Sequence, residues 1–559
     1  MHAAKKHSFL IAQLVNLALM AAASLLFAAS FPNLLVEKGI PLLAWIAYVP
    51  VFLLISRVGL GAAILWGALY GYSAYGLFNY WLSVFHPLAG LIVGLIYLVY
   101  LALLFGFLKL AEMIFDRKAW LVQFFIWLAY EYLRTKGFLG YSYGITGYSQ
   151  WTVIPLIQIA SVFGVWGVSA LVVFPSVWLG GALKKWNFEG GFAGFCGSLR
   201  EFFFREWISA SLWALFLAAA LVYGFTKGAD FSSYPQVNIA LVQHNTDPWR
   251  GGIEEYRQNY QVLRRLSDEA LSAEMKPDLV VWSETAFVPR IYWHETYRDD
   301  PSSWDLIKEL LNYFAQQDVP FLIGNDDAVK DPVLNPRAEE DYRVDYNGVL
   351  LFEKGKLTTR YRKLHLVPFT EHFPYERQLP WIYNALLNTD THFWEKGKEA
   401  TVFSIPARGE RPGFTFSSPI CFEDTFGYLS RLFVRGGADL IVNLSNDAWS
   451  ASLPAQNQHL SMAVFRAVEN RRSMARSTAS GQTCGLDPSG RILAMAPPFE
   501  EAWITVSLPL VNDKDTFYTL YGDYPGIFFT GIALILLTIG LFRRILFLIR
   551  KFFPSHDLM

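Results

Sequence analysis

Residues 417–424 read Ser417-Ser418-Pro419-Ile420-Cys421-Phe422-Glu423-Asp424, and the rest of the chain is interpreted around them. They end an apolar, β-type run that begins at Phe414, and two acids follow within three residues of the cysteine. A thiol at the end of a strand can reach a cleft rather than a core. Cysteine is nucleophilic only as a thiolate, so a catalytic cysteine needs a nearby cation and a base. Alone, the pattern equally fits a small buried hydrophobic residue, which is what most single cysteines are.

Two further stretches supply the missing groups. Residues 278–284 form an apolar strand that ends in Glu284, a carboxylate that can act as a base. Residues 360–371 carry Lys363 and, after a proline-broken loop, Glu371. The chain therefore offers a base, a cation and a thiol in the order Glu, Lys, Cys. Because Lys363 has arginine neighbours, a solvated basic cluster, or one that touches anionic lipid headgroups, explains that stretch as well.

This order is that of the catalytic triad of the nitrilase (carbon–nitrogen hydrolase) superfamily, which the domain resembles. Four motifs in the same order resemble its membrane branch, the apolipoprotein N-acyltransferases, and the resemblance covers nearly the whole chain. The motifs are the segments at Glu284, at Lys363 to Glu371, at Cys421 to Glu423, and Asn443-Leu444-Ser445-Asn446-Asp447-Ala448-Trp449.

The resemblance assigns roles to individual residues. Cys421 would be the nucleophile, Glu284 the general base, and Lys363 the cation that favours the thiolate and stabilises the oxyanion. Glu371 and Glu423 would position the lysine or the base and shape the pocket. The residues that would contact substrate are Trp249, Phe422 and Trp449, although a plain packing role fits Trp249 equally well.

The chain departs from the family pattern at two places. Phe422 stands where the family commonly has tyrosine, so any role of that hydroxyl is lost. After Trp449, residues 450–454 (Ser-Ala-Ser-Leu-Pro) replace the family's Phe-Gly and Gly-Pro, which changes the substrate loop but not the triad.

The composition indicates a membrane protein. The chain has 559 residues, of which 53% are hydrophobic and only 17% charged. Soluble globular proteins carry about a quarter charged residues. A net charge near zero excludes the basic surface expected of a nucleic-acid binder. The three cysteines, Cys196, Cys421 and Cys484, form no disulfide framework or metal motif, so we expect neither a metal nor a cofactor.

Apolar runs predict about eight membrane spans, each near the 20 residues needed to cross a bilayer. The first run, residues 9–30, is too long for the core of a signal peptide, and further spans follow it directly. We therefore predict a membrane domain of about seven helices over 1–226, a catalytic domain over 227–523, and a final helix with a basic tail over 524–559. The runs lie near 9–30, 36–56, 59–83, 88–115, 119–135, 152–182, 207–226 and 524–548.

The lysine and arginine distribution predicts the orientation. With the N-terminus inside, the predicted inner segments collect most of the basic residues, and the short outer loops hold only Lys38, Arg134 and Lys136. This bias places residues 227–523 outside the cytoplasm and 182–206 inside. Together with the resemblance, it predicts a multi-pass protein of the bacterial inner (cytoplasmic) membrane whose catalytic domain lies on the periplasmic side.

Within 227–523, strands alternate with helices, which predicts an α/β layered fold. The resemblance refines this to the nitrilase α-β-β-α sandwich. Strands are predicted at 236–243, 279–282, 320–324, 348–353, 415–420 and 440–443, and helices at 254–274, 303–317 and 458–476.

Two features allow more than one interpretation. Glu131 and Arg134 can meet on one helix face, and we favour a structural ion pair over a contact with a lipid headgroup. Residues 373–395 are unusually aromatic for an outer loop, and we favour a lipid-facing lid over ordinary core beneath a long loop.

The resemblance implies an acyltransferase. Cys421 would take an acyl chain from a membrane phospholipid as a thioester, and the N-terminal cysteine α-amine of a diacylglyceryl-modified apolipoprotein would then accept it in a ping-pong reaction. The first alternative is a membrane-tethered carbon–nitrogen hydrolase (amidase), against which the many spans and the aromatic loop argue. The second is a non-catalytic lipoprotein-binding membrane scaffold, against which the presence of all three triad residue types argues.

Overall fold

The computed structural model describes residues 2–85, 87–115, 117–184, 191–227, 230–247, 250–334, 342–387 and 393–552. Contacts divide the chain into two units, which are described one at a time. The first unit comprises Met1–Thr226 and Asp523–Met559, and the second is Lys227–Gly522.

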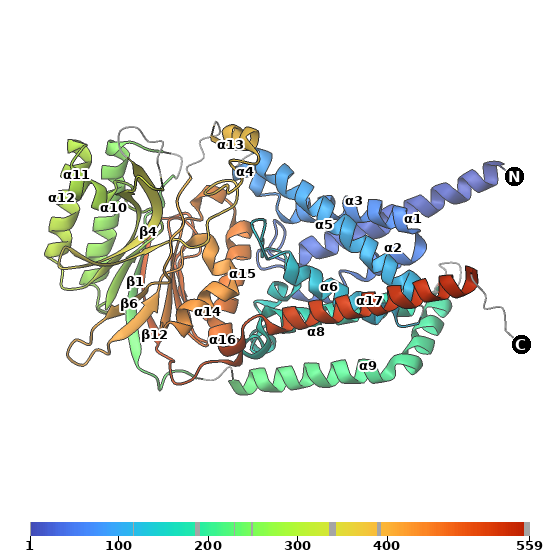
Figure 1. Cartoon of the computed structure of the whole chain (residues 1–559). Helices are drawn as coiled ribbons and strands as arrows, with labels where there is room; N and C mark the ends of the chain where they lie inside the picture. The colour runs from blue at the N-terminus through green and yellow to red at the C-terminus, as the bar shows by residue number, and fades with distance from the viewer. Residues whose placement is uncertain are drawn as a thin grey trace, which may run out of the picture. The chain divides into compact units, whose positions relative to one another are not determined.

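The first unit is helical (Figure 1). Both ends of the chain belong to this unit, and the C-terminal helix α17 packs along α6 and α8. Its elements are α1 (His2–Ser30), η1 (Pro41–Trp45), α2 (Val49–Arg57), α3 (Leu60–Phe78), α4 (Leu82–Phe85), α5 (Pro87–Ile114), α6 (Ala119–Leu133), η2 (Thr146–Gln150), α7 (Ile154–Ile157), α8 (Ala160–Leu183), α9 (Gly191–Lys227) and α17 (Tyr524–Phe552).

Five of the described helices are long and apolar enough to cross a membrane: α1, α5, α8, α9 and α17. Their exposed side chains are largely leucine, isoleucine and phenylalanine, which is the surface that a hydrocarbon solvent requires. The remaining predicted spans fall on α2, α3 and α6, which do not meet that length and hydropathy requirement. The expected multi-span helical domain is confirmed.

The expected ion pair between Glu131 and Arg134 is wrong: within the described residues these side chains hold separate partners. Arg134 Nη1 donates to the Tyr97 hydroxyl at 2.6 Å and to the Tyr141 and Tyr143 carbonyls. Glu131 accepts from Trp127 Nε1 and from Thr146. Groups of the loop after α6 bind both side chains, so their spacing on the helix alone does not determine their partners.

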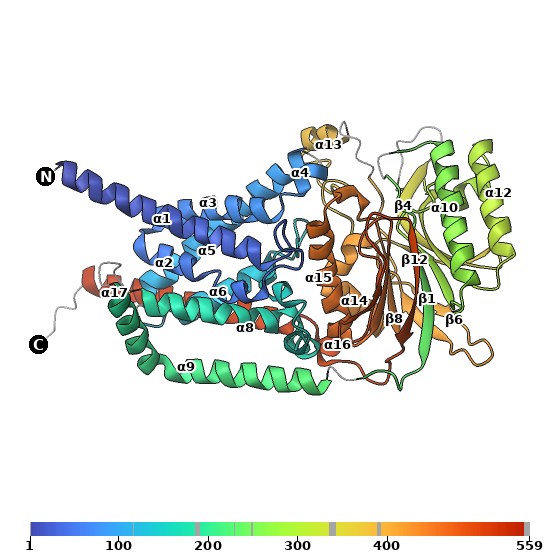
Figure 2. The ribbon, with the colours of Figure 1, turned by 180° about the vertical axis from the view of Figure 1, so that it is seen from behind.

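The second unit is built on two six-stranded sheets (Figures 1 and 2). The first sheet has the order β12-β1-β2-β3-β4-β5 and the second β11-β10-β9-β8-β7-β6. The strands are β1 (Gln236–Gln243), β2 (Leu279–Trp282), β3 (Phe321–Lys330), β4 (Arg343–Glu353), β5 (Lys356–Arg362), β6 (Val402–Ile405), β7 (Phe414–Ser417), β8 (Leu440–Ser445), β9 (Ser473–Thr478), β10 (Cys484–Leu486), β11 (Ile492–Met495) and β12 (Ala502–Pro509).

Side-chain alternation along β1 explains the layers. Val237, Ile239 and Leu241 point into a core shared with residues of the second sheet, such as Phe416 and Val442. The intervening residues of β1 face the opposite way, into a second core formed with α10 and α12. A strand buried on both faces, with period two, must lie between another sheet and a helical layer.

Helices cover both outer faces, so the expected α-β-β-α sandwich is confirmed (Figure 1). Over the first sheet lie α10 (Ile253–Ser272) and α12 (Pro301–Ala315), with α11 (Ile291–Tyr297) beside β3, and over the second lie α14 (Gly427–Arg435) and α15 (Leu453–Asn470). The short helices are α13 (Pro380–Leu387), η4 (Cys421–Thr425), η5 (Ala448–Ser450) and α16 (Phe517–Tyr521).

The predicted helix over 458–476 is wrong only in its last six residues, 471–476. Helix α15 ends at Asn470, Arg471 adopts a left-handed φ of 51°, and β9 then carries Arg476. Arg476 therefore lies within the second sheet.

Candidate active site

All three predicted triad residues follow strands, and for Glu284 and Cys421 these strands have parallel neighbours. Glu284 follows β2, which pairs in parallel with β1 and β3. Cys421 follows β7, and a parallel bridge between Ile420 and Leu444 extends the pairing up to the residue before it. The carboxyl ends of parallel strands are where α/β folds bind ligands.

Cys421 sits on a sharp turn. Its φ is 47°, in the left-handed region that non-glycine residues rarely occupy, and it begins η4 directly. Holding such a residue costs on the order of 1–3 kcal/mol, which the surrounding hydrogen bonds must offset. The turn changes the chain direction at the thiol instead of continuing the strand.

Lys363 directly follows β5 and is fully buried. Its Nζ lies 2.8 Å from Glu371 Oε1 and 3.4 Å from Glu284 Oε1. The solvated-cluster interpretation therefore fails for this lysine, whereas its neighbour Arg362 is paired with Asp327 at 2.6 Å. Burial lowers the pKa of Lys363, but the carboxylates of Glu371 and Glu284 outweigh it and raise that pKa above its usual range. The site holds a permanent cation.

Asn347 was not found by sequence reasoning. Its Nδ2 donates to Glu284 Oε1 at 2.8 Å, and its carbonyl accepts the Lys363 backbone N–H at 2.9 Å. It lies in β4, where the register pairs Gly348 with Arg362 and so brings the next residues, Asn347 and Lys363, together. Only this cross-strand pairing identifies the residue, and no local sequence motif carries it.

The Cys421 side chain is almost fully buried. Burial raises the pKa of its thiol well above the usual range, and the charge of Glu284 raises it further. Lys363 and a hydrogen bond with Ser445 oppose the shift. The resting group is therefore a thiol, and it becomes a nucleophile only when a base takes its proton.

Glu371 and Glu423 hold the site in different ways. Glu371 contacts Lys363 directly, and its other oxygen accepts the Val367 N–H at 2.8 Å. Burial raises the pKa of Glu371, although Lys363 opposes this. Glu371 thereby ties the lysine to the loop that follows it.

Glu423 binds backbone rather than Lys363. Its carboxylate accepts N–H groups from Leu364, His365 and Ile420 at 2.7–2.9 Å, and the Tyr361 hydroxyl at 2.8 Å. Burial raises its pKa to about 7, against the hydrogen bonds. Since each buried donor left unpaired costs about 1–3 kcal/mol, Glu423 locks the lysine loop to the nucleophile turn.

The three predicted substrate contacts are placed unequally. Phe422 is buried, and its ring packs on Phe426 at 5.0 Å and on His365 at 5.9 Å. Trp449 is half-buried in η5. Trp249 lies outside the described residues.

The altered loop after Trp449 forms a helix start. Ala451 adopts a left-handed φ of 44°, a conformation in which glycine would be unstrained. The Ser452 hydroxyl accepts the Ala455 N–H, and proline occupies the first turn of α15. Ser-Ala-Ser-Leu-Pro is thus a capped entry into α15.

The aromatic loop contains α13. Trp381 on this helix is 70% exposed, and Leu387 and Leu379 are also exposed. Tyr383 and Phe393 stack at 5.4 Å across residues 388–392, which lie outside the described residues.

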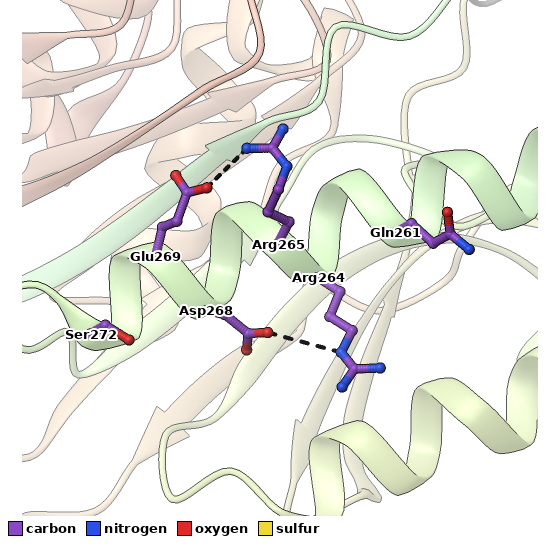
Figure 3. A pocket seen from close by; sticks show the side chains of 6 residues that line it. All are labelled: Gln261, Arg264, Arg265, Asp268, Glu269 and Ser272. Carbon is purple, nitrogen blue, oxygen red and sulfur yellow. Dashed lines mark hydrogen bonds and ion pairs between the residues drawn. The ribbon is translucent and has the colours of Figure 1, made fainter.

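A separate hollow lies along α10 (Figure 3). Its charges pair within the helix, Arg265 with Glu269 at 2.9 Å and Arg264 with Asp268 at 3.9 Å. None of its lining residues belongs to the predicted site, so it does not bear on the chemistry; they are Gln261, Arg264, Arg265, Asp268, Glu269 and Ser272.

Two protein families match the chain. The carbon-nitrogen hydrolase family matches residues 238–513, and the apolipoprotein N-acyltransferase N-terminal domain matches residues 23–178. The first match falls within the second structural unit and contains every described site residue. The second falls within the helical unit.

Similar proteins cover almost the whole chain. The Treponema denticola protein named apolipoprotein N-acyltransferase 1 is 44% identical over 533 residues, which is 93% of this chain and 95% of the relative. The Treponema pallidum protein of the same name is 46% identical over 93% of this chain and 94% of its own length. Among solved structures, Saccharomyces cerevisiae Nit3, of branch 10 of the nitrilase superfamily, aligns over 50% of this chain and 92% of its own, with 20% identity and a TM-score of 0.34.

Proposed function

Because the chain belongs to the apolipoprotein N-acyltransferase family, we propose that it moves an acyl chain from a membrane phospholipid to an apolipoprotein. The acceptor is the α-amine of the diacylglyceryl-modified cysteine at the apolipoprotein N-terminus. The reaction completes lipoprotein maturation, and its covalent intermediate is a thioester of Cys421.

In the first half-reaction, Glu284 takes the thiol proton of Cys421, and the sulfur attacks the ester carbonyl of the phospholipid. The resulting oxyanion faces the ammonium of Lys363, and a charge stabilises an oxyanion most strongly in a buried site. Collapse breaks the ester C–O bond, and the leaving alkoxide takes the proton from Glu284 as lysophospholipid departs. The acyl chain remains on sulfur.

In the second half-reaction, the apolipoprotein amine attacks the thioester carbonyl, and Glu284 takes the amine proton. A second tetrahedral oxyanion forms next to Lys363. The C–S bond breaks, the sulfur regains a proton from Glu284, and the product is an amide. Both half-reactions of this ping-pong mechanism use the same three side chains.

One observation carries this proposal: a fully buried lysine lies within 3.4 Å of two carboxylates, and its charge and that of Glu284 both act on the Cys421 thiol. A buried, permanently charged lysine beside a thiol that needs a base matches the requirements of acyl transfer. The exposed apolar face of α13 supports a lipid-facing lid, because such a surface suits an acyl chain better than water.

The test is acyl transfer by the purified full-length protein. Phospholipid vesicles with a radiolabelled acyl chain and a synthetic diacylglyceryl-cysteine peptide are expected to yield labelled amide on the peptide and an equal amount of lysophospholipid. Release of free fatty acid without peptide acylation would favour the hydrolase alternative. Peptide binding without turnover of either lipid would favour the scaffold.

We also propose that the protein lies in the bacterial inner membrane, with residues 227–523 on the periplasmic side. The positive-inside bias supports this orientation. The donor phospholipid and the lipid-modified acceptor both lie in that membrane, so a catalytic domain beside its outer leaflet can reach both.

Cysteine labelling tests the orientation. Cys196 is exposed within α9, so a membrane-impermeant maleimide applied to intact spheroplasts is expected to spare it, while a permeant maleimide labels it. In a Glu410→Cys variant, the exposed loop of the catalytic unit should react with the impermeant reagent. Impermeant labelling of Cys196 together with protection of residue 410 would reverse the orientation.

A further inference from the structure

A buried cluster of charges lies next to the nucleophile turn, and the acyl-transfer steps above do not use it. It is formed by His459, Asp424, Asp447 and Arg476, and we call it the His459 cluster. All four side chains are at most 2% exposed. Four charged groups without solvent are expensive to bury, so their arrangement calls for an explanation.

The imidazole of His459 bridges two carboxylates. Its Nε2 lies 2.6 Å from Asp424 Oδ1, and its Nδ1 lies 3.0 Å from Asp447 Oδ1. Nδ1 also lies 2.9 Å from Arg476 Nη2, which can only donate, so a neutral ring would accept a hydrogen bond there. An imidazolium instead donates from both ring nitrogens and so satisfies both carboxylates.

Charges around the ring favour the same protonation state. Burial and Arg476 lower the pKa of His459, but Asp424 and Asp447 outweigh them and raise it to about 9. Arg476 also holds the pKa of Asp447 well below its usual range, together with His459 and against burial. Cys484 on β10 also faces the cluster, and burial raises the pKa of its thiol to about 12. With an imidazolium the cluster is neutral overall.

The cluster joins the two loops that carry the site. Asp424 belongs to η4, the turn that begins at Cys421. Asp447 lies between β8 and η5, and its Oδ1 accepts the hydroxyl hydrogen of Ser445, a side chain that also influences the pKa of the Cys421 thiol. His459 on α15 is the bridge between these loops, and Arg476 on β9 donates to both carboxylates.

We propose that His459 is a positioning residue: as an imidazolium it clamps the Cys421 turn to the Ser445–Trp449 loop and so aligns the thiol for acyl transfer. This inference rests on the proposed function, which supplies the reaction that the clamp serves. His459 is buried behind the turn and needs no contact with substrate. A misplacement of the thiol by about 1 Å would cost on the order of 10²-fold in rate.

The pH dependence follows from the sign of the shift. A histidine with a raised pKa keeps its contribution below its ordinary value near 6.5 and loses it as the pH rises through about 9. Lys363 and Cys421, whose pKa values lie above that range, do not titrate there. Single-turnover acylation by wild-type protein is therefore expected to fall as the pH rises through about 9.

Two variants distinguish a clamp that needs a charge from mere packing. His459→Gln removes the charge, and should acylate about 10²-fold more slowly at pH 7.5 without an alkaline decline near 9. His459→Lys restores a cation that can reach two carboxylates, and should recover part of the rate and move the decline to higher pH. His294→Gln, at a His–Asp pair of 2.8 Å on α11, is the matched control and should behave as wild type.

A second readout needs no lipid. Alkylation of the Cys421 thiol by iodoacetamide is expected to slow in His459→Gln and to recover in His459→Lys. If His459→Gln acylates at the wild-type rate with the same pH profile, or if wild type shows no decline near pH 9, the clamp is wrong while the proposed function stands. If wild type fails to acylate but alkylation keeps its dependence on His459, the covalent mechanism is wrong and the clamp stands.

Discussion

Cys421→Ala is expected to abolish acyl transfer, with a loss of roughly 10⁴-fold or more, as when an enzyme loses its nucleophile. The thiol is the group placed at the end of a parallel strand, on a strained turn, under the charges of Glu284 and Lys363. Alanine keeps the β-carbon and removes only the sulfur, so the turn and its hydrogen bonds should survive. The measurement is peptide acylation by the purified variant in phospholipid vesicles.

A thiol in the other structural unit provides the control. Cys196 is exposed on α9, and Cys196→Ala is expected to retain full activity. Thermal unfolding of Cys421→Ala should match wild type within a few degrees, which separates lost chemistry from lost structure. Transfer by Cys421→Ala at more than a few per cent of the wild-type rate would exclude Cys421 as nucleophile.

Lys363→Ala is expected to lower turnover by about 10²–10³-fold, the effect of losing one oxyanion donor. The lysine ammonium is fully buried and is the cation nearest to both Glu284 and Glu371 among the described residues. Without it the two carboxylates would face each other unneutralised, and breaking a buried pair costs about 3–5 kcal/mol. Activity is therefore compared at a temperature at which circular dichroism shows the variant to be folded.

Arg362→Ala, at the neighbouring residue, is the matched control for Lys363→Ala. This arginine is paired with Asp327 and stacks over the Tyr346 ring at 3.9 Å, and Arg360 remains 3.5 Å from the same carboxylate. Its loss should change turnover by less than about tenfold, because Arg360 still pairs with the buried Asp327 carboxylate and, in the described part of the chain, Arg362 does not contact Glu284 or Glu371. Equal losses at the two positions would favour a role of the basic stretch in headgroup binding instead of oxyanion stabilisation.

The strands before Glu284 and Cys421 could be predicted from their apolar residues, whereas the polar strand before Lys363, β5, could not. Strands β1 and β2 match the predicted limits, since runs rich in valine, leucine and isoleucine signal burial. A cysteine at a strand end was predicted from an apolar run followed by two acids, whereas the turn that begins at Cys421 was not. Site residues that continue such runs are visible without a structure.

Strand β9 could not be predicted, because it is polar and fully buried. Its sequence, Ser-Met-Ala-Arg-Ser-Thr, lacks apolar alternation. Its side chains are held by hydrogen bonds instead: Ser473 donates to the Pro509 carbonyl, Ser477 to the Val242 carbonyl, and Arg476 to Asp447. Hydrophobic periodicity cannot predict a strand whose buried side chains are held by polar networks instead of apolar packing.

Long-range partners were the other limit. Asn347 reaches Glu284 only through the register of β4 and β5, and Arg134 leaves Glu131 for carbonyls of a loop that follows it. Both outcomes depend on which segments meet in space. Local sequence spacing indicates which residues can interact, and the tertiary fold determines which of these contacts form.

The central claim is a thioester on Cys421, and the most direct test is the intact mass of the protein after exposure to phospholipid alone. A ping-pong enzyme completes its first half-reaction without acceptor, so about one lysophospholipid per active site should appear and turnover should then stall. The account predicts one added acyl chain on a peptide that contains Cys421, removable by neutral hydroxylamine as thioesters are and amides are not. An unmodified mass, a chain on another residue, or lysophospholipid released only when acceptor is present would contradict it.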